Sequence, residues 1–370
     1  MRRIRISSPI IIALSLLVLT GCTLGNHSNS GVSTSTGTPS SISPKQIDSI
    51  SKPICISSSG FNYTMVDKNG QMIAWGDDCD TAGSWARETE TFYKFLSADN
   101  IVSVSRDRWS LLFVDDNDLL WGVGWSPWGM YQQELEQEYT PVEIMADIKM
   151  ASIGYRCYLA LDNEGNVWTW GTGAYGQVGT EPEALDGNNP LYEPIKVMNS
   201  VSYAITSGGA SYAIKEDGSL WGWGRIGIAD ENGLTHRITP EFIMDDVVHV
   251  AGGTQAFAIK TDGSLWAWGE TEVDMAENGG ELPYFRMEGP MKIMDGIKYA
   301  SIGYGHYAAV SETEELFVWG ENTSGALGDG SGEYRREPYS VMNGIRFVEC
   351  GIANIIVVDN NGDVWELGAH

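Results

Sequence analysis

The residue types that most often carry catalysis are few or unpartnered in this 370-residue chain. Its histidines are His27, His236, His249, His306 and His370, and the sequence places no serine or cysteine partner beside any of them. The chain has no nucleophile elbow, no HExxH metal motif and no glycine loop for phosphate. Its 49 acidic residues make accidental carboxylate pairs unavoidable, so a glycosidase-like pair stays open without named residues. We therefore predict a protein that is not an enzyme and has no cofactor.

Three acidic turns offer oxygen ligands of the kind that calcium prefers. They are the segments Asp77–Asp80, Asp230–Gly233 and Asp329–Glu333. None has the spacing of an EF-hand loop, and solvated turns explain them more simply. We therefore expect no metal site.

The first 22 residues have the parts of an export signal. Three arginines lie within the first five residues, and the apolar run Ile10–Leu19 is shorter than the about 20 residues of a membrane span. The sequence Leu-Thr-Gly-Cys that ends at Cys22 resembles the lipobox of bacterial lipoproteins. The resemblance implies that Cys22 is acylated, with palmitate or a similar chain, and becomes the first residue. An ordinary secretory signal with an incidental cysteine is the alternative.

The segment after the signal is a predicted tether. Residues 23–43 are mostly Ser, Thr, Gly and Asn, a composition too polar to offset the entropy of ordering the chain. The folded region, residues 44–370, would then hang from the extracytoplasmic face of the cell membrane. The net charge is −26, or −29 without the signal arginines, and this balance argues against a nucleic-acid partner.

Four further cysteines allow two interpretations. An exported chain permits disulfides, and Cys55, Cys79, Cys157 and Cys350 are even in number but have no zinc-site spacing. One disulfide, between Cys55 and Cys79, is one interpretation. The other is four unpaired thiols that act as small hydrophobic residues.

A strand-like segment that ends in Trp-Gly or a close variant recurs seven times. The segments end at Gly76, Gly124, Gly171, Gly224, Gly269, Gly320 and Gly368, at intervals of 45 to 53 residues. A strand repeat of this length indicates a propeller or a solenoid. Each repeat is predicted to open with a short strand after a proline, as in EPIKVM from Glu193, and to contain a tight turn such as Asp217-Gly218. Asp118 and Glu315 stand where two of the turns should have glycine, which predicts looser turns there.

The third strand of the repeat carries tryptophans two residues apart, which face the same way. The pairs are Trp168 and Trp170, Trp221 and Trp223, and Trp266 and Trp268, and the residues between them are Thr169, Gly222 and Ala267. Large side chains on one face and small ones on the other suit stacked sheets. We therefore predict that these tryptophans form the core.

The Leu-Trp-x-Trp-Gly strand, with GENTSGALGDG from Gly320 and GTGAYGQVGT from Gly171, resembles the repeat of the regulator of chromosome condensation family. The resemblance covers residues 44–370 and implies an all-β fold, a seven-bladed β-propeller of four-stranded antiparallel blades. In that family the second strand often carries a histidine. The equivalent positions here are Asn62, Ser110, Cys157, Ala210, Gln255, His306 and Asn354. One histidine in seven gives no ring of metal ligands, so we interpret these residues as polar groups that bond the neighbouring backbone.

Aromatic residues are predicted in the long connections that follow the Trp-Gly strands. They are Trp85, Trp125, Trp128, Tyr131, Tyr175, Tyr192, Tyr284, Phe285, Tyr334 and Tyr339. Aromatic side chains on loops of a rigid scaffold suit an interaction face. We predict that Trp125, Trp128 and Tyr284 contact the partner, while packing beneath their own loops is the alternative.

Together these observations predict a lipid-anchored, monomeric cell-surface propeller that binds an unknown protein without catalysis. The resemblance extends to secreted bacterial propellers that inhibit hydrolases, so an inhibitor of a secreted hydrolase is one specific form of this hypothesis. The alternative is an envelope carbohydrate-binding or carbohydrate-active protein whose partner is a glycan. The nucleotide-exchange role of nuclear relatives is not carried over, because the export signal places the chain outside the cytosol.

Overall fold

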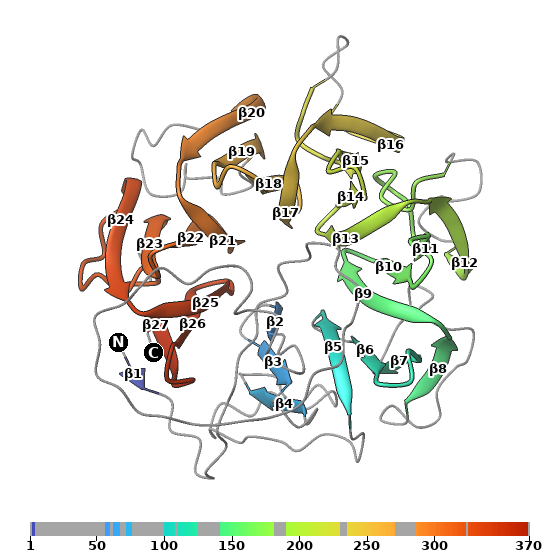
Figure 1. The fold of residues 1–370 in the computed structure, drawn as a ribbon, viewed down its shortest axis with the longest axis horizontal. Coiled ribbons are helices and arrows are strands. Elements are labelled where there is room, and N and C mark those ends of the chain that lie inside the picture. Colours follow the sequence, from blue (N-terminus) through green and yellow to red (C-terminus); the bar gives the residue numbers. More distant parts are fainter. Residues whose placement is uncertain are drawn as a thin grey trace, which may run out of the picture.

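The computed structural model describes residues 2–3, 56–59, 62–66, 72–75, 100–107, 110–124, 141–180, 190–229, 235–270, 286–322 and 325–368. Throughout these ranges the regular structure is β-strand, and no helix in them is long and apolar enough to cross a membrane. The strands form seven antiparallel sheets, six of four strands and one of three. Figure 1 shows the sheets arranged as blades around a common centre, which confirms the predicted seven-bladed propeller.

The first four blades run in chain order. The first comprises β2 (Ile56–Ser59), β3 (Asn62–Val66) and β4 (Met72–Trp75). The second comprises β5 (Ile101–Arg106), β6 (Ser110–Asp115), β7 (Leu120–Gly124) and β8 (Val142–Met145). The third comprises β9 (Ile148–Gly154), β10 (Cys157–Asp162), β11 (Val167–Gly171) and β12 (Leu191–Met198). The fourth comprises β13 (Val201–Ser207), β14 (Ala210–Lys215), β15 (Leu220–Arg225) and β16 (His236–Met244).

The last three blades continue the ring. The fifth comprises β17 (Val247–Gly252), β18 (Gln255–Lys260), β19 (Leu265–Glu270) and β20 (Arg286–Met294). The sixth comprises β21 (Ile297–Ile302), β22 (His306–Ser311), β23 (Glu315–Gly320) and β24 (Arg335–Asn343). The seventh comprises β25 (Ile345–Cys350), β26 (Asn354–Asp359) and β27 (Val364–Gly368), and its outer position is taken by β1 (Arg2–Arg3).

The proline-containing strands occupy a different place from the one that the repeat pattern predicts. Each closes a blade from the outside instead of opening it: β12, for example, pairs with β11, and the next blade starts at β13. Pro194 lies inside β12, and Pro240 lies inside β16. A proline lacks the N–H of a ladder hydrogen bond, so an outer edge strand is where a sheet accommodates it. The pairing register also shifts along β11 and β12.

The hydrophobic core consists of separate layers between neighbouring blades. Trp170, Trp223 and Trp268 are fully buried, and each packs against the blade that precedes its own. The small residues between the paired tryptophans, Thr169 and Ala267, are also buried, which confirms the predicted alternation of large and small faces. Trp319 fills the same place in the sixth blade, whereas Leu367 does so in the seventh.

One end of the ring, which we call the turn face, is formed by the tight turns between the second and third strands of the blades. At five junctions the third residue of such a turn accepts a hydrogen bond from the first residue of the next blade. The bonds run from Ile148 to Asp118, Val201 to Gly165, Val247 to Gly218, Ile297 to Gly263 and Ile345 to Glu314, each at 2.9 Å. The same backbone bond thus joins successive blades on this face, and side-chain bonds such as that from Asn163 to Asp118 add to it at single junctions.

The two turns without glycine are not looser, so that prediction is wrong. In the sixth blade the glycine position is Glu314 and not Glu315, with φ 65°, and Asp118 in the second blade has φ 60°. Both residues make the same backbone bonds as the glycine turns. The bonds to the next blade hold a non-glycine residue in the left-handed region, where strain is expected to cost on the order of 1 kcal/mol or more.

Candidate interaction face

The opposite end of the ring, which we call the loop face, is formed by the turns between first and second strands and by the connections after the third strands. Three of its side chains are among the most exposed large hydrophobic residues: Tyr155 (49%), Tyr304 (55%) and Ile352 (43%). All three come from the first turn of their blade, next to the innermost strand. Three of the seven blades thus present an exposed apolar side chain at this turn.

Aromatic rings from three separate segments lie in a row on this face. The Tyr175 ring is 6.3 Å from the Tyr155 ring and stacks on the His236 ring at 5.6 Å with an interplanar angle of 20°. The guanidinium carbon of Arg156 lies 4.9 Å from the centre of the Tyr155 ring. Tyr155 and His236 are exposed, while Tyr175 between them is half-buried. The row, Tyr155, Tyr175 and His236, thus joins one tilted pair of rings, with an interplanar angle of 42°, to one stacked pair, and Arg156 places a cation beside it.

Gln177 holds this row in place. Its side-chain carbonyl accepts the backbone N–H of Tyr175 at 2.9 Å, and its amide donates to the carbonyl oxygen of Tyr155 at 3.2 Å. Its own backbone oxygen accepts the indole N–H of Trp223 at 2.9 Å and the hydroxyl of Ser211 at 2.9 Å. Since Gln177 is fully buried, one residue ties the exposed row to the core of the next blade.

Glycines shape the surface next to the row. The first turn of the fourth blade is Gly208-Gly209, and the backbone N–H of Tyr155 donates to the carbonyl of Gly208 at 2.6 Å. A Cβ at Gly209 would lie 2.9 Å from the Tyr175 ring, and a Cβ at Gly176, where φ is 82°, would lie 2.7 Å from the carbonyl oxygen of Arg237. Both contacts are too close for a side chain, so the row depends on glycine at these positions.

A second connection, residues 320–334, is also rigid where it is described. Asn322 donates to the Asp329 carboxylate at 3.0 Å and accepts the Leu327 N–H at 3.0 Å, and Arg335 pairs with Asp329 at 2.5 Å. Burial acts to raise the pKa of Asp329, but hydrogen bonds from Ser331, Arg335 and Asn322 outweigh it and lower this pKa to about 2. This carboxylate, proposed above as part of an acidic turn, is therefore engaged within the protein.

The predicted contact residues and the predicted acylation site remain predictions. Trp125, Trp128, Tyr284 and the acylation candidate Cys22 lie outside the described residues. Of the other aromatic residues expected in connections, Tyr175 is in the row. Tyr192 and Tyr339 are exposed but lie in the outer strands β12 and β24, so their assignment to connections was wrong.

Tyr155 and Tyr304 are the exposed residues that the sequence reasoning missed. Each follows the sequence Ser-Ile-Gly at the end of an innermost strand. That recurring tetrapeptide was the available signal. The alternating strand pattern continues through the tyrosine, so the tyrosine was interpreted as a strand residue and not as the start of a turn.

The buried histidines and thiols are unsuited to acid–base or nucleophilic chemistry. His306 Nε2 lies 3.2 Å from the carbonyl oxygen of Asn354 in the next blade, which fits the predicted bonding to neighbouring backbone. Burial lowers the pKa of His306, and it lowers that of His249 to about 4. Cys157 and Cys350 are buried thiols that form no disulfide, and burial raises the pKa of Cys157 to about 12.

The disulfide expected between Cys55 and Cys79 falls outside the described residues. The acidic turns Asp77–Asp80 and Asp230–Gly233 fall outside them as well. Among the residues that the structure does describe, no group of three His, Cys, Asp or Glu side chains is placed to hold a metal ion.

Comparison with known proteins gives the repeat a family. Residues 164–211 match the family model described as the regulator of chromosome condensation (RCC1) repeat. The chain is 24% identical to the Ultraviolet-B receptor UVR8 of Arabidopsis thaliana over 345 residues, which is 86% of this chain and 77% of that protein. It is 26% identical to the mitochondrial RCC1 domain-containing protein RUG3 of the same plant, over 64% of this chain and 58% of that protein.

A solved structure has the same fold. Yeast RCC1 (Prp20), crystallised with Kap60 bound, superposes with a TM-score of 0.68 at 20% identity, over 85% of this chain and 80% of that one. At this identity the likeness shows the propeller architecture alone.

Proposed function

We propose that this β-propeller of regulator of chromosome condensation repeats is a non-enzymatic, lipid-anchored scaffold that binds a protein at the extracytoplasmic face of the cell membrane. The aromatic row of Tyr155, Tyr175 and His236 carries the proposal. It is exposed at Tyr155 and His236, it is held by two hydrogen bonds from the buried Gln177, and it lies on the less regular end of a closed ring. Rigid aromatic side chains supply much of the binding energy at protein interfaces.

The absence of catalysis is part of the proposal. In support, His306 is enclosed and its pKa is lowered, and the described thiols Cys157 and Cys350 are buried. A partner protein covered by the loop face would be blocked without any chemical step. Inhibition of a secreted hydrolase is the specific form of binding that suits such a surface.

Site-specific crosslinking in the native envelope tests the binding face. A photoreactive residue at position 155 or 304 should crosslink the partner, whereas one at the exposed Asn361 of the turn face should not. The variant Tyr155→Ala with Tyr175→Ala should then weaken partner binding by about tenfold or more, as expected for central aromatic contacts. Tyr192→Ala, which removes an exposed tyrosine from an outer strand, is the matched control. Crosslinks from Asn361 alone would overturn the assignment.

The aromatic row also favours one alternative, a carbohydrate partner, because flat rings stack on sugars as well as on proteins. Titration of the purified domain with envelope glycans separates the two. Saturable glycan binding that Tyr155→Ala abolishes, or turnover of a glycan, would replace the protein-binding proposal.

Membrane attachment is tested at Cys22. The lipobox-like sequence before this residue supports acylation, so Cys22→Ala should release the protein from membranes. Cleavage there would also remove Arg2 and Arg3 and with them β1, which leaves β27 as the outer strand of the last blade. A Cys22→Ala protein that stays membrane-bound and incorporates labelled lipid would refute the anchor.

A further inference from the structure

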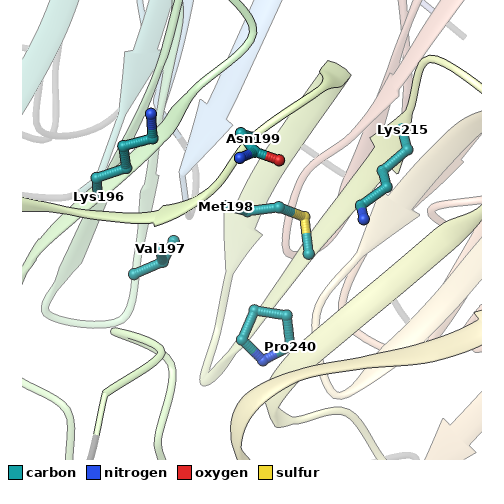
Figure 2. Close-up of a pocket in the computed structure, with 6 residues that line it drawn as sticks. All are labelled: Lys196, Val197, Met198, Asn199, Lys215 and Pro240. Atoms are coloured by element: carbon teal, nitrogen blue, oxygen red, sulfur yellow. The ribbon is translucent and has the colours of Figure 1, made fainter.

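A pocket outside the loop face lies at the junction of the third and fourth blades. Its volume is about 550 Å³, and it is lined by Lys196, Val197, Met198, Asn199, Lys215 and Pro240. Figure 2 shows the two lysines on opposite sides of the Met198 and Asn199 side chains. The pocket therefore combines two cations, one amide and three apolar side chains, and no carboxylate lines it.

The neighbouring repeats show why this junction is unusual. In the fifth blade Lys292 pairs with Asp295, three residues further on, with Nζ and Oδ1 2.6 Å apart. Lys196 occupies the equivalent place, since each lysine lies opposite the first tryptophan of its third strand, Trp266 or Trp168. In the third blade the residue three further on is Asn199, which is neutral. Lys196 therefore lacks the carboxylate partner that Lys292 has in the fifth blade.

Lys215 brings the second charge from the next blade. It lies at the end of β14, where the third and seventh blades have Asp162 and Asp359. Those carboxylates accept the indole N–H of Trp168 and Trp365 at 2.8 and 3.0 Å. In the fourth blade the ammonium of Lys215 instead lies 4.5 Å from the centre of the Trp221 ring, which limits its freedom. Asp217 lies close enough to Lys215 for the two charges to interact, but it is held by Ser219 and does not line the pocket.

We propose that this pocket binds an organic anion, a molecule with a carboxylate or phosphate group on an apolar body. Lys196 and Lys215, which flank Met198 and Asn199, attract the anionic group, and the apolar body rests on Met198 and Pro240. The chain as a whole carries a net charge of −26 and repels anions over long range, so a site for an anion needs lysines in a pocket that no carboxylate lines. This site is separate from the aromatic row and does not depend on the proposed partner binding.

Titration with two simple probes tests the proposal. Benzoate carries a carboxylate and phenyl phosphate carries a phosphate, each on a phenyl ring. Benzyl alcohol, which has the same ring without a charge, is the neutral control. Binding is followed on the full folded domain by the NMR shift of the Met198 methyl group, assigned with Met198→Leu. We expect saturable binding of at least one anion and none of benzyl alcohol, and the tighter probe identifies the preferred group.

Three variants decide whether the lysines are responsible. Asn199→Asp recreates the Lys292–Asp295 arrangement beside Lys196, so it should fold normally and weaken binding by about tenfold, as should Lys215→Gln. Lys292→Gln removes a lysine from another junction and should have no effect. The proposal would be overturned if Asn199→Asp and Lys215→Gln bind the anions as tightly as the wild type does. Binding of benzyl alcohol as tight as that of the anions, or no shift at Met198 with either anion, would also overturn it. Thermal melts of each variant check that the fold is retained.

Discussion

The turn face and the loop face are held together by different kinds of hydrogen bond. On the turn face, the same backbone hydrogen bond recurs at 2.9 Å from blade to blade. On the loop face, particular side chains hold the connections, Gln177 in one and Asn322 in another, beside the backbone bond from Tyr155 to Gly208. The first arrangement is a property of the repeat, and the second is a property of individual residues.

This difference bears on where function can reside. A backbone bond accepts many residue types, and the link before the first strand of a blade shows this. The left-handed residue there is Asp147, Ser200, Asp246, Gly296 or Gly344 in successive blades. The turn face can therefore vary in sequence without a change in shape. On the loop face a substitution changes the shape, so blades can acquire distinct surfaces.

The largest expected effect separates the two tryptophans of one strand. Trp223 is fully buried and donates to Gln177 beneath the loop face, whereas Trp221 is half-buried towards the turn face. Trp223→Ala should lower the free energy of unfolding by about 3–5 kcal/mol. Trp221→Ala should cost about 1–2 kcal/mol, because less surface is lost from the core. Urea melts of both variants measure the difference. Equal losses of unfolding free energy would show that the two tryptophans contribute equally to the core.

The next comparison is between two carboxylates that accept the same serine bonds. Asp329 on the loop face has a pKa of about 2, while Asp262 on the turn face is solvent-exposed with a lowered pKa. Asp329→Asn should cost about 2 kcal/mol at pH 7, since a carboxylate with a depressed pKa stabilises the fold above its unfolded pKa near 4. That difference from wild type should vanish as the pH falls from about 4 towards 2. Asp262→Asn is the control and should change stability less. A pH-independent difference would contradict the role of the charge.

An effect of similar size is expected at Gln177. Gln177→Ala removes the two hydrogen bonds to Tyr175 and Tyr155, at about 0.5–1.5 kcal/mol each. Asn163→Ala removes one exposed bond to Asp118 on the turn face and should cost less than 1 kcal/mol. Hydrogen exchange of the Tyr175 amide should increase in the first variant only. If both variants melt alike, the loop face does not depend on side chains as described.

The smallest effect is expected at Ser200, which has φ 56°. Two later blades have glycine at this place, Gly296 and Gly344, with φ 70° and 71°. Ser200→Gly should stabilise the protein by up to about 1 kcal/mol, because relief of strain exceeds the added entropy of the unfolded chain. Gly296→Ser should have the opposite sign. Destabilisation by Ser200→Gly, measured by thermal melts, would show that this link tolerates less variation than the backbone bonds indicate.

Local patterns in the chain were enough to predict the interior of the blades. The recurring Trp-Gly strands, with paired tryptophans on one side and Thr169 or Ala267 on the other, predict both the number of blades and the buried Trp223 and Trp268. Such features depend on residues close in sequence, whose spacing fixes which side of a strand they occupy. The pattern placed the proline strands at the start of a blade, whereas they close the preceding one. The residues of such a strand look the same whether it pairs with the strand before it or the strand after it.

The surfaces required the tertiary structure. The row of Tyr155, Tyr175 and His236 is drawn from three segments, and the pocket with Lys196 and Lys215 from two blades. The sequence by itself determined how many blades form and which side chains fill them, since burial follows strand alternation. Only the closed ring decided which residues of different blades meet at each end, because those contacts depend on the twist and register of sheets far apart in the chain.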